Sequence, residues 1–265
     1  MSTLRRTGAL TVILAIGLTS VAFAITRNGT PGNDRLIGTP QRDVLAGFSG
    51  SDFLIGLGDA DILGGGDGDD TIAGDGVCPP GASDPTYCQS GSDAGDGPDL
   101  IDGGPGNDTL DGNGNDDIVT GGTGSDRLRG QAGVDDLRGN EDTDDVRGGA
   151  GNDSIRGGTG SDIVFGEAGD DYVNGESGND RISGAFGNDR LTGGAGKDRI
   201  SSGPGDDRLS AGAGDDRLSG GSGDDRFFTR DGNTDFVSCG PGSDRVNADR
   251  RDRVSRDCER VVRRG

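Results

Sequence analysis

GGPGNDTLD (103–111), GGTGSDRLR (121–129) and GGSGDDRFF (220–228) are three copies of a nine-residue unit that fills residues 94–228 without a break. All fifteen copies have Asp at position six and an apolar residue at position eight, and nearly all have Gly at position four. A short fixed period indicates stacked small elements, because one such unit cannot bury its own apolar side chain. The repeat therefore predicts the architecture of most of the chain.

Each unit divides into a turn of about six residues and a strand of about three. The G-G-x-G-x-D half has glycines where a tight turn needs positive φ or a close approach of two backbones. In the other half only position eight faces inward, because successive strand side chains point to opposite faces. We expect an all-β, right-handed parallel β-roll, in which two units form one coil and coils lie about 4.8 Å apart.

A second block of five units covers residues 29–73, so that twenty regular units, or ten coils, are expected in the two blocks 25–73 and 94–228. Residues 74–93 interrupt the period. Gln41, Asp59, Asn115 and Asp142 replace the position-four glycine. Asn and Asp tolerate the left-handed backbone region better than other residues, so we expect the turns with Asn115 and Asp142 to survive.

The position-six aspartates are expected to line up along the two edges of the roll. Carboxylates stacked at strand spacing repel one another unless a cation lies between them, and Ca²⁺ prefers carboxylate and carbonyl oxygens. We therefore predict that several Ca²⁺ ions are held by Asp34, Asp43, Asp52, Asp61, Asp70, Asp99, Asp108, Asp117, Asp126, Asp135, Asp144, Asp153, Asp162, Asp171, Asp180, Asp189, Asp198, Asp207, Asp216 and Asp225.

The pattern G-G-x-G-x-D-x-U-x resembles the RTX, or hemolysin-type, calcium-binding nonapeptide repeat. The resemblance covers most of the chain, and about twenty copies in register are far more specific than one G-x-G-x-D. It implies a parallel β-roll in which the position-six Asp and the turn carbonyls bind Ca²⁺ between successive coils. Gln41 and Asp59 depart from the family pattern, which weakens the assignment of those two turns.

Residues 1–24 have the form of a secretion signal. Arg5 and Arg6 precede an apolar segment, 8–21, and Ala22-Phe23-Ala24 has the A-x-A form of a cleavage site. We predict cleavage after Ala24 and a secreted protein, either free or associated with the cell surface. A membrane anchor is the alternative, but the segment is shorter than the roughly 20 apolar residues of a bilayer span.

The four cysteines are predicted to form two disulfides, as is usual in an exported protein. Cys78 and Cys88 would close a surface loop within 74–93; the loop could bind a ligand, but we interpret it as a tolerated insertion. Cys239 and Cys258 would staple the last coils, and 229–265 is interpreted as degenerate repeats and a C-terminal cap. Its end, 245–265, has eight Arg and four acidic residues, so attachment to an anionic surface is the alternative.

Position seven is repeatedly Arg from residue 181 onward: Arg181, Arg190, Arg199, Arg208, Arg217 and Arg226. Because alternate units lie on opposite faces, each face is expected to carry a row of outward Arg side chains. Such rows could bind acidic glycans or other polyanions of a cell surface or matrix. We favour the interpretation that they keep the sheets soluble and offset nearby Asp.

The charge of the chain bears on its folding. The formal net charge is −21, and removal of Arg5 and Arg6 with the signal leaves 24 basic against 47 acidic residues, a net −23. Self-repulsion of this size opposes a compact state. We therefore predict that the metal-free chain is largely unfolded and that Ca²⁺ binding is coupled to folding. No nucleic-acid partner is expected.

No enzyme is predicted. The absence of His excludes H-E-x-x-H zinc proteolysis, the Ser-His-Asp triad and Cys-His chemistry. RTX-type repeats often accompany a protease, lipase or toxin domain, but here the repeats leave no room for one. The favoured function is a secreted structural calcium-binding protein. The alternative is an adhesion or ligand-binding module that uses the 74–93 loop, the Arg rows or the basic tail.

Overall fold

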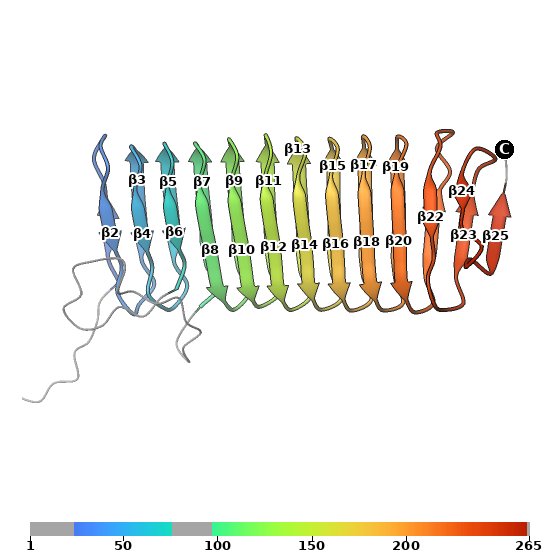
Figure 1. Ribbon diagram of the computed structural model, residues 1–265. Coiled ribbons are helices and arrows are strands. Elements are labelled where there is room, and N and C mark those ends of the chain that lie inside the picture. Colours follow the sequence, from blue (N-terminus) through green and yellow to red (C-terminus); the bar gives the residue numbers. More distant parts are fainter. Residues whose placement is uncertain (1–23, 76–96, 264–265) are drawn as a thin grey trace, which may run out of the picture.

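The computed structural model describes residues 24–75 and 97–263. These residues form 25 β-strands and no helix, and hence no helix long and apolar enough to cross a membrane. Successive strands alternate between two parallel sheets, which we call the odd and even sheets. Figure 1 shows the coils stacked along a single axis, with the C-terminus at one end of the rod. The predicted all-β parallel roll is confirmed, and its predicted right hand stays a prediction.

The odd sheet contains the strands that follow every second turn. In spatial order they are β1 (Thr26–Asn28), β3 (Val44–Ser49), β5 (Ile62–Asp67), β7 (Leu100–Pro105), β9 (Ile118–Thr123), β11 (Asp136–Glu141), β13 (Ser154–Thr159), β15 (Tyr172–Ser177), β17 (Arg190–Ala195), β19 (Arg208–Ala213), β21 (Arg226–Thr229), β23 (Arg245–Ala248) and β25 (Arg260–Arg263).

The even sheet faces it across the core. Its strands are β2 (Arg35–Ile37), β4 (Phe53–Ile55), β6 (Thr71–Ala73), β8 (Thr109–Gly114), β10 (Arg127–Ala132), β12 (Asp145–Ala150), β14 (Ile163–Ala168), β16 (Arg181–Phe186), β18 (Arg199–Pro204), β20 (Arg217–Ser222), β22 (Phe236–Ser238) and β24 (Arg253–Val254).

The register confirms that two units form one coil. In the regular region each residue pairs with the residue 18 positions later, as Leu128 does with Val146. The roll has about twelve turns rather than the ten expected from the regular units, because strands β22 to β25 continue both sheets. One extra residue in the chain shifts the spacing there, so that Leu218 pairs with Val237.

Most strands are six residues long, and the expected length of about three was too short. β19, for example, runs from position seven of one unit to position three of the next. Pairing resumes after position one, since Gly194 pairs with Gly212 and Ala195 with Ala213. The positive φ at position two therefore does not end the strand, and only positions four to six form the tight turn.

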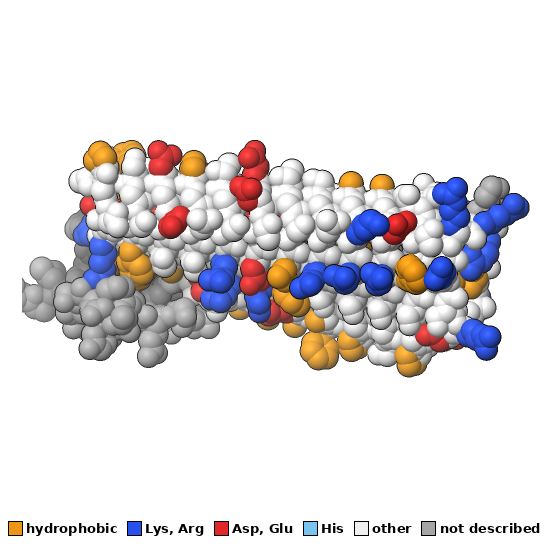
Figure 2. All heavy atoms as spheres, turned by 45° about the horizontal axis from the view of Figure 1, so that its top comes forward, with side chains coloured by type: hydrophobic (Ala, Val, Ile, Leu, Met, Phe, Trp, Pro, Cys, Tyr) orange, Lys and Arg blue, Asp and Glu red, His pale blue; other side chains and the backbone are white. Residues whose placement is uncertain are grey.

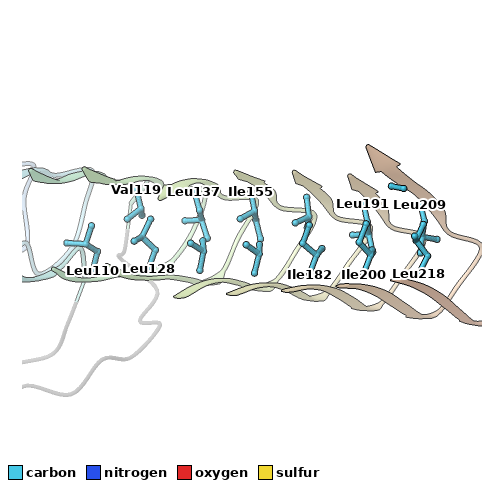
Figure 3. Close-up of a cluster of buried hydrophobic side chains, with 14 of the residues drawn as sticks. Leu110, Val119, Leu128, Leu137, Ile155, Ile182, Leu191, Ile200, Leu209 and Leu218 are labelled. Atoms are coloured by element: carbon cyan, nitrogen blue, oxygen red, sulfur yellow. The ribbon is translucent and has the colours of Figure 1, made fainter. Parts of the chain in front are cut away.

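The core is a double column of position-eight side chains. Figure 3 shows Val119, Leu137 and Ile155 of the odd sheet pointing toward Leu110 and Leu128 of the even sheet. These side chains are fully buried, and the column extends from Leu36 to Val246. Each buried Leu, Ile or Val contributes roughly 1.5–3 kcal/mol, which holds the two sheets face to face.

The interruption of the period leaves both sheets continuous. β5 pairs with β7 and β6 with β8, across a spacing of 38 rather than 18 residues. The backbone N–H of Gly74 donates to the carbonyl oxygen of Asp111, as position-one residues do elsewhere in the stack. Gly74 and Asp99 thus serve as positions one and six of one turn. Cys78 and Cys88 lie outside the described residues, so their predicted disulfide stays a prediction.

The C-terminal coils are held by protein groups. The predicted disulfide between Cys239 and Cys258 is confirmed, with the two Cα atoms 5.2 Å apart. Arg side chains donate to backbone carbonyl oxygens of the last turns: Arg251 to Gly232 at 2.7 Å, and Arg263 to both Asp249 and Asp252 at 2.9 and 3.0 Å. These bonds satisfy carbonyls that the last coil would otherwise expose.

Candidate metal centre

The position-six side chains form two continuous ladders, one along each edge of the roll. In each step the backbone N–H of one Asp donates to Oδ1 of the Asp one coil later, as Asp126 does to Asp144 at 2.8 Å. The tight turn between positions four and six places each carboxylate beside the backbone of the preceding coil. One oxygen of each stacked carboxylate is therefore held by a backbone donor, a pattern that the sequence did not predict.

The first ladder consists of Asp34, Asp52, Asp70, Asp108, Asp126, Asp144, Asp162, Asp180, Asp198, Asp216, Asp235 and Asp252. The second consists of Asp43, Asp61, Asp99, Asp117, Asp135, Asp153, Asp171, Asp189, Asp207, Asp225, Asp244 and Glu259. All twenty predicted site residues thus lie on these two edges.

The second carboxylate oxygen distinguishes the interior turns. Apart from Asp34, the predicted site residues are at most 3% exposed. In most interior turns Oδ2 is buried and has no hydrogen-bond partner, for example in Asp126, Asp144 and Asp162. A buried carboxylate oxygen without a protein partner is costly, so these atoms indicate groups that bind a cation or carry a proton.

Burial changes the acidity of these groups. Loss of solvent raises the pKa of Asp61, Asp108 and Asp144 to about 7 and that of Asp117 to about 8, although a backbone N–H bond to each carboxylate lowers it. Neighbouring carboxylates raise the pKa further. Without a cation, the folded ladders therefore disfavour the charged form.

Glycine at position one leaves room beside each Oδ2. A Cβ added to Gly157 would lie 2.5 Å from Oδ2 of Asp162 and 3.0 Å from the carbonyl oxygen of Gly175, one coil later. The same convergence of a carboxylate oxygen and a carbonyl oxygen recurs at most other position-one glycines, whereas the nearest atoms at Gly166 and Gly184 all belong to the Asp side chain. Each forms an oxygen-lined hollow that any larger residue would fill.

The turn carbonyls point along the stack. A Cβ on Gly122 or Gly124 would collide with the carbonyl oxygen of Gly104 or Gly106 in the preceding coil. Position four keeps its left-handed backbone conformation when glycine is replaced, since Asn115 and Asp142 have φ of 71° and 74°. That expectation is confirmed, and Asp59 behaves likewise with φ 62°.

The first two turns differ from the interior ones. In each, Thr at position two donates its backbone N–H and its hydroxyl to Oδ2: Thr30 to Asp34, and Thr39 to Asp43. The turn with Gln41 is further closed by a β-bridge between Thr39 and Gln41. Oδ2 of each of these two carboxylates has protein donors, so these two predicted site residues lack the feature that indicates a cation elsewhere.

At the other end of the first ladder the pattern is similar. Oδ2 of Asp252 accepts hydrogen bonds from the Thr229 hydroxyl at 2.7 Å and from the Asp249 backbone N–H at 2.9 Å.

Two interior turns depart from the pattern in another way, because Ser202 and Ala211 replace the position-one glycine there and are fully buried. The Ser202 hydroxyl donates to the carbonyl oxygen of Gly220 at 2.6 Å, so it uses an oxygen that is open in other turns.

The sequence shows Asp235 and Asp244 approximately in register with the repeat, but the list of predicted site residues does not include them. Both are fully buried ladder members with an unpartnered Oδ2, like the interior residues. The spacing of 19 rather than 18 residues from Asp216 and Asp225 hid their place in the repeat. The apolar residues two positions later, Val237 and Val246, were the available signal, since both are buried in the core column.

The donor set fits calcium. Among residues 24–75 and 97–263 no three acidic, His or Cys side chains gather around one point, so an ion here must take backbone ligands. Each interior turn offers Oδ2 of an Asp, the carbonyl oxygen of position one in the next coil, and turn carbonyls, all of them hard oxygen ligands. Ca²⁺ accepts mixed carboxylate and carbonyl sets of this kind. When bound, it supplies the positive charge that stacked carboxylates lack.

The fold and these edges define a parallel β-solenoid built for cations between its coils. The model of the RTX calcium-binding nonapeptide repeat matches residues 28–76 and 93–236 in overlapping copies, which is more than two thirds of the chain. The chain therefore belongs to the family of RTX calcium-binding nonapeptide repeat proteins, whose repeats bind Ca²⁺. A comparison with curated proteins gave no match.

Proposed function

We propose that this protein is a secreted, non-enzymatic calcium-binding rod that folds when Ca²⁺ binds between its coils and then serves as a structural element of the cell surface or matrix. The observation that carries the proposal is the row of buried, unpartnered Oδ2 atoms along both edges. In a folded protein such atoms need a cation, and the adjacent carbonyl oxygens complete a calcium-type donor set.

Coupling of binding to folding follows from the distribution of these ligands. Each hollow combines oxygens of two successive coils, as Asp162 and Gly175 do, so it exists only when the coils are stacked. The net charge of −23 after loss of residues 1–24 opposes stacking until cations neutralise it. An ion that binds only the folded chain stabilises it in proportion to the logarithm of its concentration.

Secretion is supported by general features of the chain. Proteins with these repeats are typically secreted, and the Cys239–Cys258 disulfide fits an oxidising compartment. Extracellular modules commonly bind Ca²⁺ in the range of about 10⁻⁴–10⁻³ M. Sites of this affinity would stay empty in a low-calcium cytoplasm and fill after export.

The proposal of a non-catalytic role rests on what the repeats contain. The family match is to RTX repeats, and the aspartates that could act as paired acids are already used in the two ladders. A structural role agrees with the rod of about twelve turns and its continuous core.

The test is far-UV circular dichroism of residues 25–265 during a calcium titration, with magnesium as the control cation. We expect a cooperative change from coil to β-structure near millimolar Ca²⁺ and none with Mg²⁺, which demands a smaller octahedral site. A β-rich spectrum that is the same in chelator and in calcium would refute the coupling. A coil spectrum at high calcium would refute the site assignment as well.

A further inference from the structure

The strands of the C-terminal half differ from the rest of this acidic chain. From β16 (Arg181–Phe186) to β25 (Arg260–Arg263) no strand contains an acidic residue, although nearly all contain Arg. The acidic side chains of this region lie in the turns. A protein with a net negative charge thus has two sheet faces that are locally basic.

On the odd sheet these arginines form one unbroken row. Arg190 pairs with Arg208, Arg208 with Arg226, Arg226 with Arg245, and Arg245 with Arg260. We call these five residues the arginine strip. All five are exposed, and stacking at strand spacing makes the strip about 19 Å long.

The even sheet has a shorter version of the same row. Figure 2 shows basic side chains over β16, β18 and β20 followed by a hydrophobic one. Arg181, Arg199 and Arg217 pair in sequence, and Phe236 then takes the next position. The guanidinium of Arg217 lies 5.4 Å from the Phe236 ring centre. This row therefore provides a natural comparison for the strip.

Among the described residues, the guanidinium groups of the arginine strip form no ion pairs with carboxylates. In the described parts of the chain, the ion pairs are made by Arg138, Arg147, Arg156 and Lys197. The three arginines pair with position-seven aspartates: Arg138 and Arg147 with the Asp of their own strand, and Arg156 with Asp136 of the neighbouring strand. From β17 onward position seven of the odd sheet is Arg in every strand, so the strands of that face carry no carboxylate. The nearest exposed carboxylates belong to the turns, where Asp206 and Asp224 line a hollow beside the strip without forming ion pairs with it.

A groove runs beside the strip. It is lined by Arg190, Arg208, Thr192, Ser210 and Phe228, and a second hollow continues it past Phe228 to Asn247. The guanidinium of Arg208 lies 5.7 Å from the Phe228 ring centre. The groove thus combines a cationic wall, hydroxyl and amide groups, and one aromatic surface.

We propose that the arginine strip and its groove bind a linear acidic polysaccharide with one carboxylate per sugar, such as a polyuronate, lying along the axis of the roll. Each coil offers one guanidinium, and Arg binds a carboxylate with two parallel hydrogen bonds. The hydroxyl and amide groups of the groove can bond sugar hydroxyls, and Phe228 can pack against a sugar ring. The proposal concerns the calcium-loaded rod and goes beyond its structural role.

Periodicity favours this ligand over other anions. The arginines repeat at about 4.8 Å, close to the advance of one sugar in an extended glycan. The phosphates of a nucleic-acid duplex wind around its axis with a rise of about 3.4 Å per strand, so only a few of them can face one straight row of arginines. A second copy of this chain offers no continuous acidic row to match the strip. Its exposed turn acids, such as Asp206 and Asp224, are interrupted by Asn188 and Ser243.

The test is isothermal titration calorimetry of the calcium-loaded protein with hexagalacturonate, an oligomer too short to gel with calcium. We expect R190Q/R208Q/R226Q to weaken binding by about tenfold, the product of three lost exposed charge contacts. R181Q/R199Q/R217Q removes the same charge from the even sheet and is expected to bind within about twofold of the original. Circular dichroism in calcium verifies that both variants are folded, independently of binding.

The result has clear contrary outcomes. No binding of hexagalacturonate by the folded protein would overturn the proposal, as would an equal loss in both triple variants, which would indicate attraction by net charge alone. Equal affinity for a thymidylate hexanucleotide would show an unselective anion surface and overturn the glycan assignment. Arg-dependent self-association in sedimentation, without glycan binding, would assign the strip to a second copy instead. Failure of the protein to fold in calcium would instead count against the proposed function.

Discussion

The interior turns and the end turns of this solenoid differ in the hydrogen bonds of the position-six carboxylate. In an interior turn such as that of Asp144, Oδ1 accepts a backbone N–H and Oδ2 has no protein partner. In the first turns Thr30 and Thr39 donate to Oδ2, and at the far end Thr229 and Asp249 do so. We call a turn open when Oδ2 has no protein donor and closed when it has one. The first ladder is open in its middle and closed at both ends, and the second is closed at its N-terminal end.

The difference indicates how the stack begins and stops. An interior site is shared by two coils, so a cation there joins neighbours and favours continued stacking. An end coil has only one neighbour, and protein donors replace the missing half of the site. At the C-terminus Arg251 and Arg263 extend this principle, since their guanidinium groups bind the carbonyl oxygens of the last turns.

The largest expected effect concerns the whole open ladder at once. Burial raises the pKa of interior residues such as Asp61, Asp117 and Asp171 above the ordinary value, to about 7 or 8. In the metal-free protein the folded state then binds more protons than the unfolded state between about pH 4 and 7, so its stability falls as pH rises through that window. We expect the metal-free chain to gain β-structure on acidification from pH 7.5 to 5, measured by far-UV circular dichroism.

Calcium should reverse the sign of this dependence. The ion must displace the protons, so the calcium affinity of the folded protein is expected to fall as pH falls from 7.5 to 5. A metal-free chain that stays unfolded at pH 5, or a calcium affinity of the folded protein that rises on acidification, would contradict the buried ladder. The two titrations use the same protein and differ only in the cation.

The next effect distinguishes the two classes of turn by mutation. In D126N/D144N/D162N each Asn keeps an oxygen for the backbone N–H of the preceding coil but loses the charged Oδ2. We expect roughly three fewer bound ions and a loss of about 1.4 kcal/mol per site when free calcium is ten times the dissociation constant. Equilibrium dialysis gives the number of ions, and denaturant unfolding in calcium gives the free energy.

The matched control is D34N/D43N in the end turns. Because Thr donors already occupy Oδ2 there, the number of bound ions should not change, although local hydrogen bonds are lost. If the end variant loses as many ions per residue as the interior variant, the distinction between open and closed turns is wrong.

The sequence predicted the architecture because its period leaves few alternatives. A nine-residue repeat with one apolar position fixes which side chains meet, and the core column from Leu36 to Phe227 is the predicted one. It also placed the carboxylates on two edges, since position six has a constant offset from position eight. The list of ladder residues predicted from the sequence was incomplete only near the C-terminus. There one extra residue changes the spacing to 19, so that Asp235 and Asp244 fall outside the exact nine-residue period.

The partners of each carboxylate were beyond sequence reasoning. Thr30 and Thr39 stand at position two, where other units have Gly, Asn, Glu, Gln, Ala, Phe or Leu. Nothing in the period indicates that the backbone N–H of this position faces Oδ2. Likewise, the sequence alone identifies the glycine at position one only as a residue of a turn. Only the three-dimensional approach of Asp162 Oδ2 and the Gly175 carbonyl shows that its missing side chain leaves a ligand-lined hollow.

A smaller effect is expected from the closed C-terminal end. C239S/C258S removes a crosslink between residues 19 apart, which should lower stability by about 3 kcal/mol. The loss should begin in β22 to β25, so hydrogen exchange in calcium should quicken there before it does in β10 to β14. The control C78S/C88S alters the other two cysteines. Uniform acceleration along the whole rod would show that the end is not a separate cap.

The smallest expected effect comes from restoring the open form at two interior turns. Ser202 and Ala211 fill the position-one hollow beside Asp207 and Asp216, and the Ser202 hydroxyl occupies the Gly220 carbonyl oxygen. S202G/A211G should free these oxygens and increase calcium affinity in that coil, raising the bound ions by up to about two. In chelator the same change should destabilise, because each new glycine costs about 0.5–1 kcal/mol of backbone entropy.

Opposite signs in calcium and in chelator are the diagnostic result, since a purely structural effect of glycine would destabilise in both. The converse variant G157A fills an open hollow beside Asp162 and is expected to lose calcium affinity, because its Cβ would lie 2.5 Å from Oδ2. If S202G/A211G binds calcium no better and G157A binds it no worse, the position-one glycine serves the turn alone. The hollow would then have no part in holding the cation, and the ligands would have to come from the turn carbonyls and the carboxylates.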